Sequence, residues 1–384
     1  MQNFVYHNPV KILFGRGQIA NIGGEIPADA KILMTYGGGS IRASGVYDQV
    51  RAALAGRAVV EFGGIEPNPR YETLMQAVEV VRSNGVGFLL AVGGGSVLDG
   101  TKFISAAALF DGDPWDILAK QAPINTAIPL GAVLTLPATG SEMNFFAVIS
   151  RLETREKLAF GNPLIYPRFS VLDPETTLTL PARQIANGVV DAFVHVLEQY
   201  LTYPADAPLQ DRLAEAILLT LIEEGPKTLA DPGDYTARAN LMWSATMALN
   251  GMIAAGVPQD WATHMIGHEI TALHGLDHAQ TLAVVLPGTM IACQDAKREK
   301  LLQYAERVWG IRDGVAGDRI VAAVDRTRKF FESLGVPTRL SNYGVASDTI
   351  PVIVERLETR GTTSLGERGD VTPAKVGEIL AHCA

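Results

Sequence analysis

The sequence predicts a chain of two domains, an α/β domain built on a parallel sheet followed by an all-helical domain. Up to residue 180, short apolar runs alternate with helical patterns and Gly-rich turns, which is typical of α/β proteins. From residue 181 onward, long segments of helical periodicity follow one another with almost no β-branched alternation. A chain of 384 residues with 47% hydrophobic residues is long enough to form two cores. We therefore expect one domain at residues 1–180 and another at residues 181–384.

The first domain contains the same motif twice, an apolar strand followed by Gly-Gly-Gly-Ser. The two strands are expected at residues 31–36 and 88–92. Between them, Asn68 and Pro69 mark the start of a helix, because Pro is favoured at the first helical position. Further strands are expected at residues 132–136 and 170–173. Strands that alternate with helices in this way imply a mostly parallel sheet.

Both Gly-rich turns are expected at the carboxyl ends of their strands, where nucleotide phosphates bind to backbone N–H groups. Neither turn matches the Gly-x-Gly-x-x-Gly pattern, and a single triple-Gly turn is more often a tight turn than a ligand site. The second turn carries more weight, because Ser96 is placed to cap a helix over residues 97–108 and Asp99 to complete a capping box. Capping alone would also explain these two residues.

The second domain is expected to consist of helices separated by short turns. Clear helical periodicity is seen at residues 209–224, 237–253, 300–309 and 320–334. Four of the seven histidines of the chain lie within residues 261–282. His264 and His268 are four residues apart in a helical pattern, so both imidazoles face one side of a helix. His274 and His278 follow on a turn and on the start of the next helix, and this density favours a metal site over isolated core histidines.

A second pair of candidate ligands, Asp191 and His195, lies four residues apart on a helix that is apolar nearly all round. Such a helix is predicted to be buried, where an ionised Asp and an imidazole are costly unless they are paired or bound to metal. This pair alone is equally consistent with an Asp–His hydrogen bond without metal. Together with the histidines of residues 261–282, it predicts a site for one divalent metal ion.

Charge and composition point to small molecules as partners. The net charge of -9, with no basic run, argues against nucleic acid and against an anionic membrane surface. No apolar run reaches the roughly eighteen residues of a membrane-spanning helix. The two cysteines form no Cys-x-x-Cys motif, and the first residues show no signal-peptide pattern, so a cytoplasmic location is expected.

Several motifs, in this order, make the chain similar to a known family. They are FGRG at residues 14–17, YGGGS at 36–40, GGIEPNP at 63–69, AVGGGSVLDGTK at 91–102 and LPATGSE at 136–142, with the two histidine-bearing stretches. The chain resembles the iron-containing (group III) alcohol dehydrogenases over essentially its whole length, and most of all their NADPH-dependent aldehyde reductase and butanol dehydrogenase branch. The resemblance implies a Rossmann-like sheet domain followed by an all-helical metal-binding domain, as in dehydroquinate synthase.

The resemblance also implies site residues. The implied ligands of an Fe²⁺ or Zn²⁺ ion are Asp191, His195, His264 and His278. His268 resembles a family position near the nicotinamide and is the expected catalytic proton relay, whereas His274 is given no role. The implied NADP(H)-binding positions are Gly38, Gly39 and Ser40 at the adenosine end, Asn68, Gly94, Gly95, Ser96 and Asp99 along the phosphates and the nicotinamide half, Thr135 and Thr139 after the third strand, and Lys157.

The implied activity is hydride transfer between NADP(H) and a small aldehyde or primary alcohol, with the chain working as an aldehyde reductase. A metal- and NAD-dependent polyol dehydrogenase of glycerol type is the alternative within the same fold. A dehydroquinate synthase is disfavoured, because the stretches that carry the expected ligands lack the several Lys and Arg that its phosphorylated substrate needs. A non-catalytic metal or nucleotide binder is a third and less favoured class. The expected partners are the small substrate and a second copy of the chain, as a homodimer.

The choice of NADP(H) depends on the turn after the first strand. Dehydrogenases that use NAD commonly place a carboxylate there for the ribose 2'-OH, and NAD-using members of the resembled family carry Asp at the third position of this turn. Here that position is Gly39, so nothing repels a 2'-phosphate, and Ser40 and Arg42 are placed to donate to it. Glu61, at the end of the next strand, is the alternative acid. We discount it because the chain turns straight after it.

One departure from the family concerns Phe145 and Phe146, which follow the Thr-Gly-Ser-Glu motif where many relatives carry small residues. Two interpretations are open. The rings either line and narrow the substrate pocket, or they belong to the core of a β-hairpin with Val148 and Ile149, which is the favoured interpretation.

Overall fold

The computed structural model describes residues 1–384, and the chain divides into two compact units. We call His7–Pro181 together with Asp231–Thr246 the sheet unit, and Met1–Tyr6, Ala182–Ala230 and Met247–Ala384 the helical unit. The sequence predicted a single division at residues 180 and 181. In the structure, residues 1–6 pack with the helical unit and residues 231–246 with the sheet unit. No local pattern marks either exchange, because both follow from tertiary contacts.

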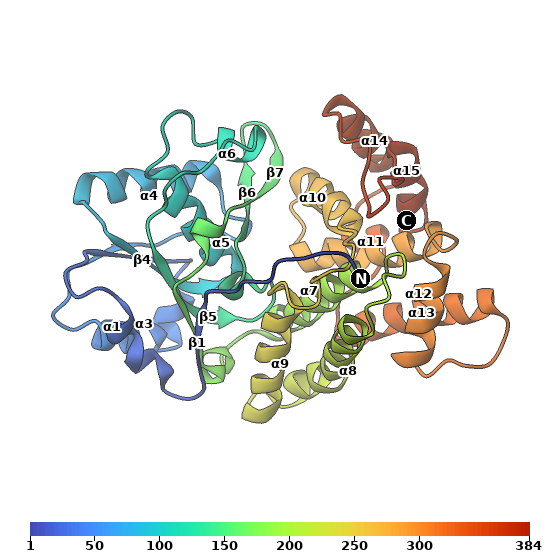
Figure 1. Ribbon diagram of the computed structural model, residues 1–384, viewed down its shortest axis with the longest axis horizontal. Helices are drawn as coiled ribbons and strands as arrows, with labels where there is room; N and C mark the ends of the chain where they lie inside the picture. The colour runs from blue at the N-terminus through green and yellow to red at the C-terminus, as the bar shows by residue number, and fades with distance from the viewer. The chain divides into compact units, whose positions relative to one another are not determined.

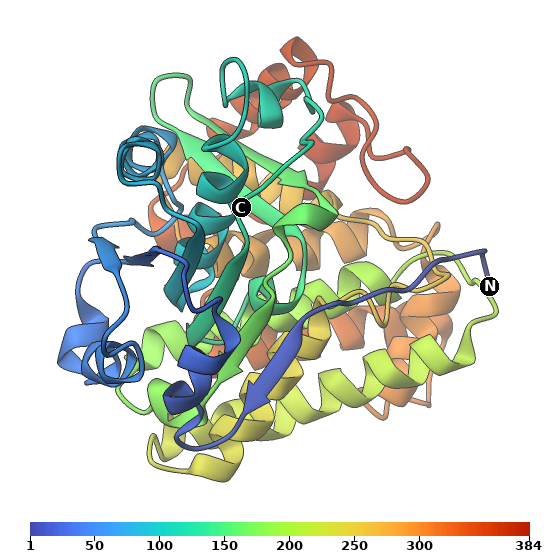
Figure 2. The same cartoon turned by 60° about the vertical axis from the view of Figure 1, so that its left-hand side comes forward.

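The sheet unit is built on parallel strands in the order β1-β8-β5-β4-β2-β3. Strands β1, β4 and β5 of this sheet are labelled in Figure 1. The strands are β1 Lys11–Phe14, β2 Ile32–Tyr36, β3 Val59–Phe62, β4 Phe88–Gly94, β5 Leu130–Leu136 and β8 Phe169–Leu172. The predicted parallel sheet is therefore confirmed. The sequence analysis did not predict β1, whose apolar run of Ile12, Leu13 and Phe14 is short. This strand lies at the edge of the sheet, dark blue in Figure 2, and is exposed at both ends.

Helices cover both faces of this sheet. They are α1 Ile22–Glu25, α2 Ser40–Ala43, α3 Val46–Ala53, α4 Tyr71–Asn84, α5 Gly95–Ala107, α6 Asp116–Ala119 and α9 Tyr235–Ala248. Successive strand residues point to opposite faces and join two cores. Leu33 and Leu89 pack in the core that contains α4 and α5, whereas Ile32 and Leu90 pack in the core that contains α1 and α3. Strands buried on both faces account for their continuous apolar sequences.

The start of α4 differs from the prediction. The helix begins at Tyr71 rather than at Asn68 and Pro69, and it ends before Gly85 as expected. Asn68 adopts a φ of 54°, in the left-handed region, so the chain turns at this residue instead of entering the helix. The Asn-Pro signal was therefore correct for a turn and too early for a helix.

A two-stranded antiparallel hairpin follows β5, with β6 Phe146–Arg151 paired to β7 Glu156–Gly161. The predicted hairpin is thus present, but its two phenylalanines are not equally buried. Phe145 packs edge-on against Tyr166 with ring centroids 5.1 Å apart, whereas Phe146 is 46% exposed. A Cβ atom on Gly161 would lie 2.7 Å from the Phe146 ring, so a glycine opposite Phe146 makes room for it.

The helical unit confirms the predicted all-helical class. Its helices are α7 Ala182–Tyr200, α8 Pro208–Ala230, α10 Ala262–His274, α11 His278–Ala292, α12 Arg298–Arg307, α13 Ala316–Ser333, α14 Thr349–Thr359 and α15 Pro373–Ala381. Helix α11 packs against both α7 and α10, which brings the two ligand-bearing stretches of the sequence together. None of the helices combines the length and the apolar character needed to cross a membrane.

Candidate metal centre and nucleotide-binding loops

Helix α7 carries Asp191 and His195 one turn apart on a buried face. Both residues are 3% exposed, and Oδ1 of Asp191 lies 3.6 Å from Nε2 of His195. Burial, together with the neighbouring His264, holds the pKa of His195 well below its ordinary value. A neutral imidazole keeps a free lone pair, so His195 is in the form that binds a metal ion.

Helices α10 and α11 bring further histidines to this face. Helix α10 ends before Gly275, which adopts the left-handed conformation that such ends favour. Helix α11 begins at His278 behind a capping box formed by Asp277. The carboxylate of Asp277 also accepts hydrogen bonds from Arg183 of α7, so the start of α11 is tied to α7. As a result, Nε2 of His278 lies 3.8 Å from Oδ1 of Asp191.

Asp191, His195 and His264 form the tightest cluster of candidate ligands. Their ligand atoms all lie within 4.8 Å of one another, and all three residues are buried. The rings of His195 and His264 stack with centroids 4.8 Å apart, and the ring of His278 lies 5.1 Å from that of His264. The structure therefore brings together the four residues expected to hold the metal, and His278 is the most exposed of them.

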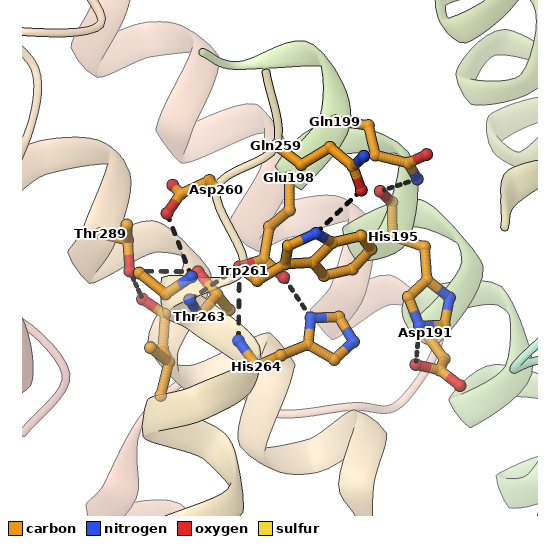
Figure 3. A network of polar contacts seen from close by, with 12 residues as sticks. Asp191, His195, Glu198, Gln199, Gln259, Asp260, Trp261, Thr263, His264 and Thr289 are labelled. Atoms are coloured by element: carbon orange, nitrogen blue, oxygen red, sulfur yellow. Dashed lines mark hydrogen bonds and ion pairs between the residues drawn. The ribbon is translucent and has the colours of Figure 1, made fainter. Parts of the chain in front are cut away.

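Glu198 was not among the predicted site residues, yet it holds His264 in place (Figure 3). Its Oε2 atom is hydrogen-bonded to Nδ1 of His264, and its Oε1 atom accepts a hydrogen bond from the main-chain N of Thr263 at 2.7 Å. These contacts fix the first turn of α10 and the direction of the His264 ring. A signal was present in the sequence, because Glu198 lies three residues after His195 on a largely apolar helix, where a charge needs a partner.

The nitrogen atoms of this cluster fit a divalent cation. Nε2 of His264 is buried without a hydrogen-bond partner, which is unusual for a polar atom unless a ligand satisfies it. A carboxylate on Nδ1 of His264 leaves the lone pair on Nε2, and ligating histidines are commonly oriented in this way. Imidazole nitrogens together with one carboxylate oxygen suit Fe²⁺ or Zn²⁺.

Glu198→Gln is expected to weaken metal binding about 10- to 100-fold, because the amide keeps the size of the side chain but loses the charge that orients His264. Chelator competition on the purified protein measures this affinity. Glu215→Gln is the matched control, since Glu215 is another buried carboxylate of the helical unit and contacts Tyr200 instead of the cluster. Unchanged metal affinity in Glu198→Gln would show that Glu198 only caps α10.

The two remaining histidines of this stretch differ in their surroundings. His268 is 6% exposed, and its ring centroid lies 5.3 Å from that of His278 and 6.4 Å from that of His264. It is thus a neighbour of the cluster and not a member of its tightest part. Nε2 of His274 lies 2.7 Å from the Thr349 hydroxyl, so this histidine links α10 to α14.

The Gly-rich turns of the sheet unit lie at one edge of the sheet. Strand β4 has β2 and β5 as its two neighbours, and all three are parallel. Residues 37–40, 94–96 and 135–139 therefore lie at, or directly after, the carboxyl ends of adjacent strands. This edge is where open parallel sheets bind nucleotides.

Direct contacts link several of the residues that were expected to bind the cofactor. The main-chain N of Asn68 donates to Oγ of Ser96 at 3.3 Å, and Nζ of Lys157 donates to Oδ1 of Asn68 at 2.9 Å. A Cβ atom on Gly95 would lie 2.5 Å from the side chain of Thr139, so glycine is required for this close approach. The N-terminus of α5, which begins at Gly95, suits the phosphates of a dinucleotide. The assignment of individual cofactor-binding residues stays a prediction.

The predicted cap of α5 was wrong. The helix starts at Gly95 without a side-chain cap, and Ser96 lies inside its first turn. Asp99 instead accepts hydrogen bonds from the Ser141 hydroxyl at 2.6 Å and from the main-chain N of Val148 at 3.0 Å. Burial raises the pKa of Asp99, and Lys102 opposes this effect. The tertiary contact with the hairpin thus replaced the local capping box.

The predicted cofactor choice depends on the turn after β2. Gly39 adopts a φ of 106°, and no atom lies within 4 Å of the position that its Cβ would take. Glu61, the alternative acid, accepts hydrogen bonds from the hydroxyls of Tyr47 at 2.8 Å and Tyr36 at 3.2 Å, and from Arg42 at 3.2 Å. The guanidinium of Arg42 also lies 3.7 Å from the centre of the Tyr47 ring. Glu61 is therefore already engaged within the protein.

Comparison with known proteins agrees with this architecture. Residues 9–174 match the family described as iron-containing alcohol dehydrogenase, and residues 185–380 match the Fe-containing alcohol dehydrogenase family, C-terminal. The chain is 62% identical to the NADPH-dependent aldehyde reductase YqhD of Escherichia coli (strain K12), over 97% of each chain. It is 42% identical to the probable NADH-dependent butanol dehydrogenase 1 of Bacillus subtilis (strain 168), over 94% of this chain and 95% of that protein.

Solved structures show the same fold in both units. The crystal structure of E. coli K-12 YqhD superposes with a TM-score of 0.99 at 60% identity, and the comparison covers 100% of this chain and 99% of that one. The NADH-dependent butanol dehydrogenase A of Thermotoga maritima gives a TM-score of 0.95 at 38% identity, with the same coverage. The resemblance read from the motifs is confirmed. The chain belongs to the iron-containing alcohol dehydrogenase family.

Proposed function

We propose that the protein is a metal-dependent oxidoreductase that transfers hydride between NADP(H) and a small aldehyde or primary alcohol, and that it works as an aldehyde reductase. The observation that carries this proposal is the buried cluster of Asp191, His195 and His264, in which Nε2 of His264 has no protein partner. Family membership and the 62% identity to an NADPH-dependent aldehyde reductase support the same activity.

When bound, a divalent cation supplies a Lewis acid for the carbonyl oxygen, and a reduced nicotinamide supplies the hydride. Among the proposed ligands, Asp191 contributes the single negative charge, whereas the imidazoles of His195, His264 and His278 are neutral donors. The protein therefore neutralises only part of a divalent charge and leaves the remainder for the developing negative charge on the substrate oxygen. Burial of the cluster excludes water, which strengthens these electrostatic interactions.

NADP(H) is proposed over NAD(H) because the turn after β2 carries no acidic side chain and Glu61 is bound by Tyr36, Tyr47 and Arg42. Of the two relatives described above, one is named for NADPH and the other for NADH. The comparison alone therefore does not decide between the two cofactors, and the proposal depends on the residues of the turn. The NAD-dependent polyol dehydrogenase is less well supported, since those relatives are an aldehyde reductase and a butanol dehydrogenase. By the usual affinity order, Zn²⁺ binds such a site more tightly than Fe²⁺ when both are available.

His268→Ala is expected to retain its metal and to lose roughly 10²-fold or less in kcat, because bound water can replace an imidazole that only relays a proton. The buried position of His268 beside His278, outside the tightest cluster, supports this role. Steady-state rates and metal content measured on the same sample test it. Loss of metal from His268→Ala would make His268 a ligand instead.

The proposed activity is tested by aldehyde-dependent oxidation of NADPH with the purified protein, and metal content is measured on the same sample. A small aldehyde is expected to be reduced with NADPH far faster than glycerol is oxidised with NAD. Glycerol oxidation with NAD as the faster reaction would favour the polyol dehydrogenase. Binding of metal and NADPH without turnover of either substrate would favour a non-catalytic binder.

Two further proposals concern assembly and location. We propose a homodimer, and the edge strand β1 supports it. Phe14 of β1 packs against Trp243 of α9 with ring centroids 5.9 Å apart, and both side chains are 40% exposed. Light scattering of the purified protein tests this, and a monomeric mass would contradict it.

We propose a cytoplasmic location, supported by Cys293 and Cys383, which are buried as free thiols. Cell fractionation tests this location.

A further inference from the structure

Lys102 lies within α5 with its side chain fully buried. An ammonium group in such a position costs free energy unless hydrogen bonds and nearby charges compensate it. Burial lowers the pKa of Lys102 to about 8, and the nearby carboxylates of Asp99 and Glu142 oppose this effect. No step of the proposed reaction uses Lys102, so its place in the core calls for another explanation.

The ammonium group binds two neutral oxygen atoms of residues 137–146, which we call the β5–β6 loop. Nζ of Lys102 donates to Oδ1 of Asn144 at 3.0 Å and to the main-chain O of Phe146 at 2.8 Å. The two nearby carboxylates take hydrogen bonds from other groups, Asp99 from Ser141 and Glu142 from Thr246. The directional contacts of Lys102 therefore go to the loop, and the carboxylates balance its charge from a distance.

Asn144 passes this contact on to the start of the loop. Its Nδ2 group donates to the main-chain O of Gly140 at 2.9 Å and of Thr139 at 3.4 Å, and its Oδ1 atom also accepts from the main-chain N of Phe146 at 3.0 Å. With Lys102, these contacts use both donors and both acceptor positions of the amide. The side chain is 4% exposed, so water does not offer substitutes. Asn144 thus closes the loop on itself and attaches it to α5.

The start of the loop, at Thr139, lies against the Gly-rich turn at Gly95. The hydroxyl of Thr139 accepts a hydrogen bond from the main-chain N of Ser141 at 3.2 Å, and the Thr139 side chain occupies the space beside Gly95. The Ser141 hydroxyl in turn donates to Asp99, which lies three residues before Lys102 on the same side of α5. Asp99 and Lys102 therefore hold the loop at two points, Asp99 at Ser141 and Lys102 at Asn144.

We infer that Lys102 is a positioning residue for the cofactor site: through Asn144 it fixes the β5–β6 loop and so sets Thr139 against the Gly-rich turn at Gly95. This inference depends on the proposed function, because it assumes that NADP(H) binds at this turn. In this role Lys102 does not contact the cofactor, and it acts only through the loop. Its removal should therefore loosen the loop and weaken NADPH binding while the metal cluster, which lies in the helical unit, keeps its affinity.

Lys102→Met tests the inference, because methionine keeps an unbranched side chain of similar length and removes the ammonium group. In the metal-loaded protein, the Kd for NADPH is expected to rise about 10-fold, as loss of charged hydrogen bonds predicts. Hydrogen exchange of residues 137–146 should become faster, and metal affinity should not change. Ser105→Ala is the matched control, since it removes a buried hydrogen bond of the same helix, to the main-chain O of Ile128, without touching the loop.

A double-mutant cycle with Asn144→Leu separates action through Asn144 from general loss of packing. If Lys102 acts through Asn144, the double variant loses no more NADPH affinity than the weaker-binding single variant, whereas independent effects would multiply. Wild-type affinity in Lys102→Met, or multiplied effects in the cycle, would overturn the inference. If Lys102→Met does not fold, Asn144→Leu alone decides, and its binding NADPH as the wild type does would also overturn it. If the wild type does not bind NADPH, the proposed function fails, and hydrogen exchange of the loop still decides whether Lys102 fixes it.

Discussion

Replacing His264 with alanine is expected to remove the bound metal and to lower kcat/KM by about 10³-fold or more, because Lewis-acid stabilisation of the substrate oxygen is worth several kcal/mol. The substitution deletes the Nε2 atom that lies buried without a protein partner. His278→Ala is expected to act in the same way, since its Nε2 atom lies 3.8 Å from Oδ1 of Asp191. Metal content per chain and steady-state rates, measured on the same samples, give both results.

His274→Ala provides the matched control for these variants. His274 belongs to the same histidine-rich stretch, but its Nε2 atom contacts the Thr349 hydroxyl and not the cluster. The control is expected to keep its metal and its turnover, at a modest cost in stability for the lost hydrogen bond. Full metal occupancy with normal activity in both His264→Ala and His278→Ala would contradict the assignment of the ligands.

Gly39→Asp is expected to shift cofactor preference toward NADH by about 10²-fold, mainly by weakening NADPH, because a carboxylate in this turn repels the 2'-phosphate by a few kcal/mol. The space around the Cβ position is open, so the side chain itself meets no obstacle. The ratio of kcat/KM for NADPH to that for NADH, measured with one aldehyde, reports the shift. The wild type is expected to prefer NADPH, and a wild-type preference for NADH would contradict the account of this turn.

Backbone strain must be separated from charge in this experiment. Gly39 adopts a φ of 106°, which side chains rarely adopt, so any substitution strains the turn. Gly39→Asn carries the same strain and nearly the same shape without the charge. It is expected to weaken both cofactors to a similar extent and to leave their ratio close to that of the wild type. An equal shift of the ratio in Gly39→Asn and Gly39→Asp would attribute the effect to strain.

Hydrophobic periodicity, together with Gly, Pro and Asn residues at turns, was sufficient to predict the fold class and several of its elements. Strand β4 is buried on both faces and ends in glycines, so its apolar run and its turn were visible in the sequence. Local signals failed where tertiary contacts competed with them. Asp99 bonds to Ser141 and Val148 instead of capping α5. The helical pattern that begins at residue 237 is confirmed by α9, but no local pattern indicates that residues 231–246 pack with the sheet unit.

The candidate site was predictable to the extent that its residue types are rare. The histidine-rich stretch was found because four histidines crowd into residues 261–282. The resemblance to the family then implied His264 and His278 as ligands, and the structure places their rings 5.1 Å apart. Glu198 and Lys102 were missed, although each is a charged residue on a largely apolar helix. Such a residue indicates that a buried partner exists, but the identity of the partner depends on which segments the fold brings beside it.

Metal titration of the stripped protein tests whether turnover depends on one metal ion held by Asp191, His195, His264 and His278. The chain is freed of metal with a chelator, and Fe²⁺ or Zn²⁺ is then added under anaerobic conditions while NADPH oxidation by a small aldehyde is followed. We expect activity to be lost on stripping, to rise in proportion to bound metal and to saturate at one ion per chain, with no recovery in His264→Ala. Full activity in the metal-free protein, or equal recovery in His264→Ala, would contradict it.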